Sequence, residues 1–320
     1  MDGEERELFE KGLRHAAASH TGEALDAALG ELGWRDALAA DARAAVSLLF
    51  ELQGAANATS SALDDVILAA LDAAPTPAVG VVLPSLGGWD APGRVEGGEL
   101  AVRGLGTAGL RHRPAAVVVA GTGEGHLAAI VETADLELRR VAGIDPSLGM
   151  VEVAADGVRH HDRVPAPPAA WPAALAAGRL AVGHELVGAA RQMLCLACDH
   201  ARERIQFGRP IASFQAVSHR LADTRVAIDA AEAAMHAAWD DGSPLTAALA
   251  KAIAGRGASA ARRHCQQVLA GVGFTTEHPL HRYVRRTLVL DGLLGDARSL
   301  TRWLGDDLLR TRRLPAILPL

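Results

Sequence analysis

Two proline clusters divide this chain into three segments, and this division constrains the fold more than any other feature of the sequence. The first cluster is Pro75-Thr76-Pro77 and the second is Pro165-Ala166-Pro167-Pro168. Because proline cannot continue a helix and restricts the residue before it, each cluster favours a boundary between structural units. The chain has 320 residues, which is enough for two or three domains.

The three segments differ in the spacing of their apolar residues. In residues 1–77 apolar residues recur every three or four positions, as at Val46, Leu49 and Phe50, which is typical of helices. Residues 78–166 contain short β-branched runs separated by Gly and Pro, which predict a small antiparallel β domain. Residues 167–320 are rich in Ala, Leu and Arg, with breaks that leave about four long helices. We therefore predict a mostly α, α+β protein with a helical domain, a middle β domain and a C-terminal four-helix bundle.

One glycine-rich stretch in the β segment could be mistaken for a phosphate-binding loop. Gly121-Thr122-Gly123-Glu124-Gly125 joins two of the β-branched runs. A phosphate loop of this kind is followed by a helix, and no helical pattern follows here. The stretch therefore predicts a hairpin turn.

Composition and charge exclude several classes of function. The net charge is −6 and aromatic residues are 3% of the chain, which argues against a nucleic-acid-binding surface. No apolar run approaches the ~18 residues of a membrane span, and the acidic N-terminus lacks the apolar region of a signal peptide. The three cysteines fit a reducing cytoplasm, and no metal-binding signature is convincing.

The most informative segment of the chain is a short turn between two helical runs. Residues 204–215 read R-x-Q-F-G-x-P-I-x-x-F-Q, a helix end, a Gly-Pro turn and a new helix start. They hold Arg204, Phe207 and Gln215 at fixed offsets. A cation, a phenyl ring and amides are the groups that an anionic, partly aromatic ligand such as a dinucleotide requires.

A second motif follows about sixty residues later. Residues 267–279 read Q-V-L-A-G-V-G-F-T-T-E-H-P, in which Gly271 and Gly273 would let the backbone approach a ligand closely. Together the two motifs closely resemble segments of the acyl-CoA dehydrogenase family, whose second motif has a glycine where this chain has Ala270. The order of helical domain, β domain and bundle is also similar to that family's.

The resemblance implies FAD as the cofactor and gives roles to five residues. Arg204 would contact the FAD pyrophosphate, Phe207 would pack on the cofactor, and Gln215 would bond to its ADP side. Gln267 and Gly271 would hold the adenosine end. In the family these groups reach across a subunit interface to a neighbour's flavin. Taken alone, Arg204 could equally cap a helix C-terminus, where its charge suits the helix dipole.

Other features of the family look absent from this sequence. The loop and W-[IV]-[TS] strand that seat the flavin ring are not recognisable, although Thr107 could remain as a lone contact, and Trp89 is expected at a domain edge. The two family positions for the catalytic base fall on Leu294 and near Gly178, which cannot take a proton. Glu185, Asp296 and Asp291 are weak alternatives, each of which also fits a helix-surface or capping carboxylate. Residues 282–286, R-Y-V-R-R, favour a solvated helix face over contact with a CoA phosphate or another subunit.

The resemblance is closest to the short, degenerate subunit of heteromeric α2β2 bacterial acyl-CoA dehydrogenases, with a shortened N-terminal helical domain. We expect such a chain to supply ADP-side FAD contacts to a catalytic, full-length acyl-CoA dehydrogenase partner. The assembly would act as an oxidoreductase on an acyl-CoA of lipid metabolism, with electron-transfer flavoprotein as its acceptor by family resemblance. One alternative is a homomeric enzyme with an unusual base. Another is a structural paralogue that binds neither FAD nor substrate.

Overall fold

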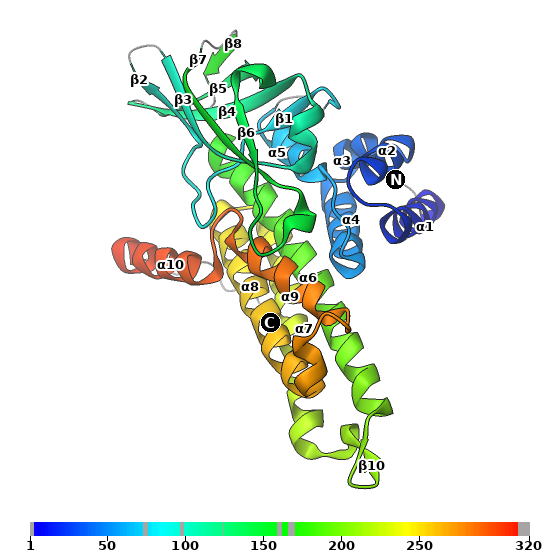
Figure 1. Cartoon of the computed structure of the whole chain (residues 1–320). Coiled ribbons are helices and arrows are strands. Elements are labelled where there is room, and N and C mark those ends of the chain that lie inside the picture. The colour runs from blue at the N-terminus through cyan, green and yellow to red at the C-terminus, as the bar shows by residue number, and fades with distance from the viewer. Residues whose placement is uncertain are drawn as a thin grey trace.

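A computed structural model of the chain describes residues 3–72, 76–96, 99–123, 125–158, 162–165 and 170–312. Helices and a sheet follow one another in the predicted order, and the sheet lies at one end of a long helical bundle (Figure 1). The chain is thus mostly helical with a small main sheet, as its pattern predicted. None of the described helices is both long enough and apolar enough to cross a membrane.

The N-terminal helices pack beside the sheet and against the upper part of the bundle (Figure 1). The Asp41 carboxylate accepts from the Ala44 amide at 2.9 Å and begins the fourth helix, which ends at Asn57 in the left-handed conformation. The helices are α1 (Gly3–Ser19), α2 (Glu23–Glu31), α3 (Trp34–Ala40), α4 (Ala42–Ala56) and α5 (Ala62–Ala70).

The sheet is mixed, whereas the sequence predicted an antiparallel one. β1 and β2 each pair in parallel with β4, and the remaining pairings are antiparallel. The period of the apolar residues predicts a strand but not its direction. The direction depends on how the connecting segment leads from one strand to the next. The strands are β1 (Val79–Val81), β2 (Gly93–Glu96), β3 (Glu99–Gly106), β4 (Ala115–Thr122), β5 (Gly125–Glu132), β6 (Glu137–Arg140), β7 (Val151–Val158) and β8 (Asp162–Pro165).

The glycine-rich stretch is the predicted hairpin. β4 and β5 are antiparallel, and Thr122 pairs with Gly125 across the turn.

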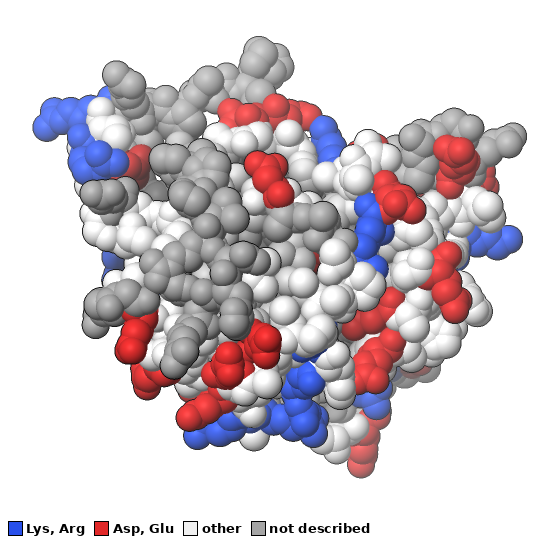
Figure 2. Space-filling model, turned by 90° about the horizontal axis from the view of Figure 1, so that it is seen from above, with Lys and Arg blue, Asp and Glu red and all other residues white. Residues whose placement is uncertain are grey.

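Seen from above the sheet, acidic and basic side chains are interspersed among uncharged ones (Figure 2).

The bundle is built around α6 (Ala170–Glu203), which packs against α4, α5, α7, α8 and α9. Two glycines bring α4 and α6 close together: a Cβ on Gly54 would overlap the Glu185 carbonyl, and one on Gly188 would overlap the Glu51 carbonyl. The other helices are α7 (Gln215–Asp241), α8 (Pro244–Leu269), α9 (Leu280–Gly292) and α10 (Ala297–Thr311). α10 turns away from the bundle axis (Figure 1).

Candidate functional site

The first motif forms a small hairpin at the end of the bundle farthest from the sheet (Figure 1). β9 (Ile205–Gln206) pairs with β10 (Arg209–Pro210), so Phe207 and Gly208 form a two-residue turn. Both have positive φ, 53° and 76°, as a type I′ turn requires. A phenylalanine is strained in that conformation, yet its ring is 91% exposed. The hairpin therefore presents Phe207 to a ligand or another chain rather than to its own core.

The polar groups of the first motif are also exposed. The Arg204 guanidinium and the Gln215 amide have no hydrogen-bond or ion-pair partner among the described residues. The Phe214 ring lies between its neighbours, with Phe207 edge-on at 6.0 Å and the Arg209 guanidinium 4.3 Å from its centroid. These stacked groups hold the turn in a fixed shape.

The second motif follows the end of α8 as a 3₁₀ turn, η5 (Ala270–Phe274). Gln267 and Gly271 are exposed, and apart from its two chain neighbours no described residue comes within 4 Å of a Cβ built on Gly271. Ala270 adopts φ 50° and ψ −132°, a conformation that suits glycine and strains a residue with a Cβ. The residue at which this chain departs from the family motif is therefore a strained one.

Packing between helices brings the two motifs to the same end of the bundle. His200 at the end of α6 contacts His278 edge-on, with 6.5 Å between ring centroids. Thr224 of α7 and His264 of α8 share a hydrogen bond of 3.0 Å. The five residues expected to contact FAD are thus exposed at the same end of the bundle, and we call this set the bundle tip: Arg204, Phe207, Gln215, Gln267 and Gly271.

The chemistry of the bundle tip fits the anionic half of a dinucleotide. It offers an exposed guanidinium, two exposed amides and an open backbone at Gly271. Bound FAD would supply hydride acceptance, while these residues could only bind and orient it. Their cofactor role stays a prediction.

The two positions expected for a catalytic base lie face to face. A Cβ on Gly178 would lie 2.6 Å from Leu294 Cδ1, so the leucine fills the space above the glycine. Leu294 is 2% exposed. Neither residue can accept a proton, and the leucine excludes water from this site.

Two buried cations hold the turn that carries Leu294. Lys251 Nζ donates to the Asp291 carbonyl at 2.9 Å and the Gly295 carbonyl at 3.2 Å, and Arg179 Nε donates to the Leu294 carbonyl at 3.0 Å. Burial lowers the pKa of Lys251 to about 8 and that of Arg179 to about 10. The turn is therefore fixed by charge-assisted hydrogen bonds and not by apolar packing alone.

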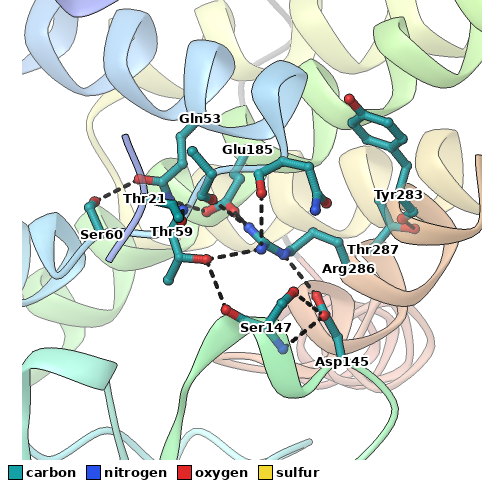
Figure 3. A network of polar contacts seen from close by, with 12 residues as sticks. Thr21, Gln53, Thr59, Ser60, Asp145, Ser147, Glu185, Tyr283, Arg286 and Thr287 are labelled. Atoms are coloured by element: carbon teal, nitrogen blue, oxygen red, sulfur yellow. Dashed lines mark hydrogen bonds and ion pairs between the residues drawn. The ribbon is translucent and has the colours of Figure 1, made fainter. Parts of the chain in front are cut away.

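Glu185 is not a surface carboxylate, and its surroundings do not suit a base. It is 3% exposed, and its oxygens accept from Arg286 at 3.2 Å and from Gln53 at 3.0 Å (Figure 3). Burial raises the pKa of Glu185 while the Arg286 charge opposes that shift. The cavity beside Glu185 is about 40 Å³, room for water but not for an acyl group.

Asp296 caps a helix. Its carboxylate accepts from the Arg298 amide at 2.9 Å and the Ser299 amide at 3.0 Å, at the start of α10. Burial acts to raise the pKa of Asp296, but these hydrogen bonds outweigh it and hold the pKa below its usual value. Asp291 accepts from the Ala297 amide at 3.2 Å in the same turn. The capping interpretation is confirmed for Asp296.

The prediction of a solvated helix face for residues 282–286 was wrong for Arg286. Its side chain is fully buried, where a solvated helix face was expected. Its Nε donates to Asp145 at 2.9 Å, and its other nitrogens reach Glu185, the Ala58 carbonyl and the Thr59 hydroxyl (Figure 3). The helical spacing could have indicated this burial, because Arg286 lies on the same face of α9 as the buried Tyr283 and Leu290.

Thr107 and Trp89 also have defined places. The Thr107 hydroxyl donates inward to Asp64 at 2.8 Å and is thus already engaged within the protein. Trp89 lies between the sheet domain and the bundle, with Arg179 5.8 Å from its ring and Trp303 edge-on at 6.4 Å. Trp89 therefore covers the turn that holds Leu294, since its ring also approaches Gly295.

Comparison with known proteins identifies the class of the bundle. Residues 170–307 match the family described as "Acyl-CoA dehydrogenase, C-terminal domain". Among solved structures, the chain resembles the ChsE4-ChsE5 complex from Mycobacterium tuberculosis with a TM-score of 0.79, at 21% identity and 99% coverage of both chains. It also resembles a Tcur3481-Tcur3483 steroid ACAD variant, with a TM-score of 0.77, 22% identity and 97% coverage of both chains.

Relatives by sequence agree with this assignment. The chain is 40% identical to the acyl-CoA dehydrogenase IpdE2 of Mycobacterium tuberculosis over 118 residues, 37% of each chain. It is 43% identical to FadE34 of the same organism over 127 residues, 38% of this chain and 17% of that protein. The matched region is thus well under half of either relative. Residues 170–307 are thus similar to the C-terminal domain of acyl-CoA dehydrogenases, and the chain as a whole has the fold of these solved structures.

Proposed function

We propose that this chain is a subunit of a heteromeric FAD-dependent acyl-CoA dehydrogenase. Its bundle tip would contact an FAD that is bound mainly by a partner chain. In this assembly Arg204, Gln215 and Gln267 bind the ADP half of FAD. The partner seats the flavin ring and supplies the carboxylate that removes the α-proton of the acyl-CoA thioester. Electron-transfer flavoprotein is the acceptor that family membership suggests.

The observation that carries the proposal is the contrast between the two sites. At the position expected for the base, Leu294 fills the space above Gly178, and buried cations fix its turn. At the bundle tip, Arg204 and Gln215 are exposed and without partners among the described residues, and Phe207 is 91% exposed. A chain with a filled catalytic position and an open cofactor surface is suited to completing another chain's site.

The comparisons support the same proposal. Two similar solved structures are named for a pair of chains, the ChsE4-ChsE5 complex and the Tcur3481-Tcur3483 steroid ACAD. The second name suggests that a bulky polycyclic CoA ester is the substrate class to test first. Glu185 and Asp296 do not favour a homomeric enzyme, because the first is paired with Arg286 and the second caps α10.

The test is the flavin content of the chain alone and with a full-length paralogue from the same genome. We expect a colourless chain when it is expressed alone, and one flavin per two chains in the co-purified complex. Stoichiometric flavin on the chain alone, with turnover of a CoA ester, would overturn the proposal in favour of a homomeric enzyme. A stable complex that holds no flavin would favour a structural paralogue.

Substitutions at the bundle tip test which residues bind. Arg204→Ala and Gln215→Ala should each weaken FAD retention in the complex by on the order of 1–3 kcal/mol, because each removes a polar or charged contact. Arg202→Ala is the matched control, since Arg202 is exposed in the last turn of α6 and, among the described residues, has Asp199 as its one ion-pair partner. Equal flavin retention in all three variants would exclude the bundle tip as a flavin site.

A further inference from the structure

A polar cleft of about 280 Å³ opens between the N-terminal helices and the sheet domain. Its walls come from the turn between α1 and α2, from residues 59–61, from the 3₁₀ turn η1 (Ala108–His112), from the end of β6 and from residues 147–149. The elements that form these walls lie in or beside the sheet, whereas the hairpin of the bundle tip is at the opposite end of the molecule (Figure 1). The cleft is therefore separate from the proposed flavin surface.

The cleft is lined by two carboxylates and two guanidinium groups, and only the guanidinium groups lack a partner among the described residues. Arg111 and Arg140 line it, both are exposed, and neither has a hydrogen-bond or ion-pair partner among the described residues. The two acidic residues of the lining are already engaged: Glu23 pairs with His112 at 2.7 Å, and Asp26 accepts from the Ser61 amide at 2.6 Å. Two guanidinium groups thus remain for a ligand.

Hydroxyl groups add hydrogen-bond capacity to the same cleft. Ser61 is 1% exposed, and its hydroxyl oxygen is buried with no partner among the described residues. The Thr21 oxygen accepts from the Thr59 amide at 3.0 Å, and its hydroxyl hydrogen has no acceptor among the described residues (Figure 3 shows both threonines). Ser147 does not contribute in the same way, because its hydroxyl is bonded to Asp145.

We propose that this cleft binds an oxyanion of the phosphate type. Guanidinium groups are the side chains best matched to the paired oxygens of a phosphate, and hydroxyl donors complete its coordination. An apolar ligand would leave these donors unsatisfied on binding, at a cost. A cation would meet two unpaired arginines.

The test uses the whole chain with inorganic phosphate as the probe. Thermal unfolding is followed at rising phosphate concentration. Sodium chloride at matched ionic strength is the control for salt effects, and acetate is the control for binding of a carboxylate anion. We expect phosphate alone to raise Tm, by about 2–5 °C near saturation. Isothermal titration then gives the Kd for phosphate, and Arg111→Gln and Arg140→Gln should each weaken it by about tenfold.

Adjacent residues on one strand provide a matched control. Arg139 precedes Arg140 on β6, is exposed, does not line the cleft and pairs with Glu152. Arg139→Gln should leave the Kd for phosphate unchanged. The proposal is wrong if chloride raises Tm as much as phosphate, or if Arg139→Gln weakens binding as much as Arg140→Gln. Acetate binding as tightly as phosphate would replace the phosphate assignment with a carboxylate one.

Discussion

At the scale of single residues, strain marks a position where this chain departs from the motif that it resembles. Ala270 adopts φ 50° and ψ −132°, which a Cβ makes unfavourable. We expect Ala270→Gly to raise the free energy of unfolding by about 1 kcal/mol, because strain relief exceeds the entropy cost of glycine. Chemical denaturation measures the change. Ala233→Gly, at an exposed site inside α7, should instead lower stability by about 0.5–1 kcal/mol.

Lys251 should make stability depend on pH in the alkaline range. Burial lowers the pKa of Lys251 to about 8, and the charge of Arg179 acts in the same direction. The carboxylates of Asp291 and Asp296 oppose this shift because they favour the charged lysine. The unfolded chain binds the lysine proton up to about pH 10.5, so it holds more protons than the folded chain between pH 8 and 10.5. The free energy of unfolding should therefore rise across this window, by on the order of 1–3 kcal/mol.

Replacing Lys251 isolates this effect from other groups that titrate in the same range. Lys251→Met keeps most of the apolar stem of the side chain but removes its charge and its hydrogen bonds to the Asp291 and Gly295 carbonyls. The rise in stability between pH 8 and 10.5 should be smaller in this variant than in the parent. Parallel pH profiles of the two proteins would show that Lys251 is not responsible.

At the scale of elements, one guanidinium joins parts of the chain that are far apart in sequence. Arg286 of α9 contacts Glu185 of α6, Asp145 of the β6–β7 connection and the backbone of residues 57–58 (Figure 3). Gln53 of α4 bonds to Glu185 and to Ser60. The network thereby ties the sheet domain to the N-terminal helices and to the bundle.

Removing Arg286 should be costly because it leaves two buried carboxylates without their cation. We expect Arg286→Met to lower the free energy of unfolding by about 3–5 kcal/mol. Arg285→Met is the control, since Arg285 is exposed on the same helix, and its effect should stay within about 0.5 kcal/mol. Similar losses for both variants would mean that the network contributes nothing specific.

At the scale of the whole molecule, exposed aromatic rings suggest that the bundle tip is covered in the assembled protein. Phe207 is 91% and Phe274 73% exposed, although burying such rings is strongly favourable. We expect Phe207→Ser with Phe274→Ser to reduce self-association of the isolated chain without changing its Tm appreciably. Analytical ultracentrifugation measures the association. The same variant should also bind the partner chain less tightly, and unchanged affinity would place the interface elsewhere.

Much of the architecture could be predicted because its signals are local. The period of the apolar residues distinguishes helix from strand, and the proline clusters fall where helices cannot continue. The hairpin after β4 followed from its glycines. The parallel pairing of β1 and β2 with β4 could not be predicted, because strand direction depends on how the chain crosses between layers.

Some features of the candidate site could likewise be predicted from the sequence, whereas others depend on the tertiary structure. The sequence by itself determined the resemblance to acyl-CoA dehydrogenases, through two motifs with fixed local spacings, and this resemblance placed Leu294 and a site near Gly178 where a base would be expected. Only the tertiary structure decided that these two residues face each other, that Arg286 and Glu185 are buried as a pair, and that Arg111 and Arg140 line one cleft. These contacts join residues far apart in the chain, and burial depends on how separate elements pack, which no local pattern records.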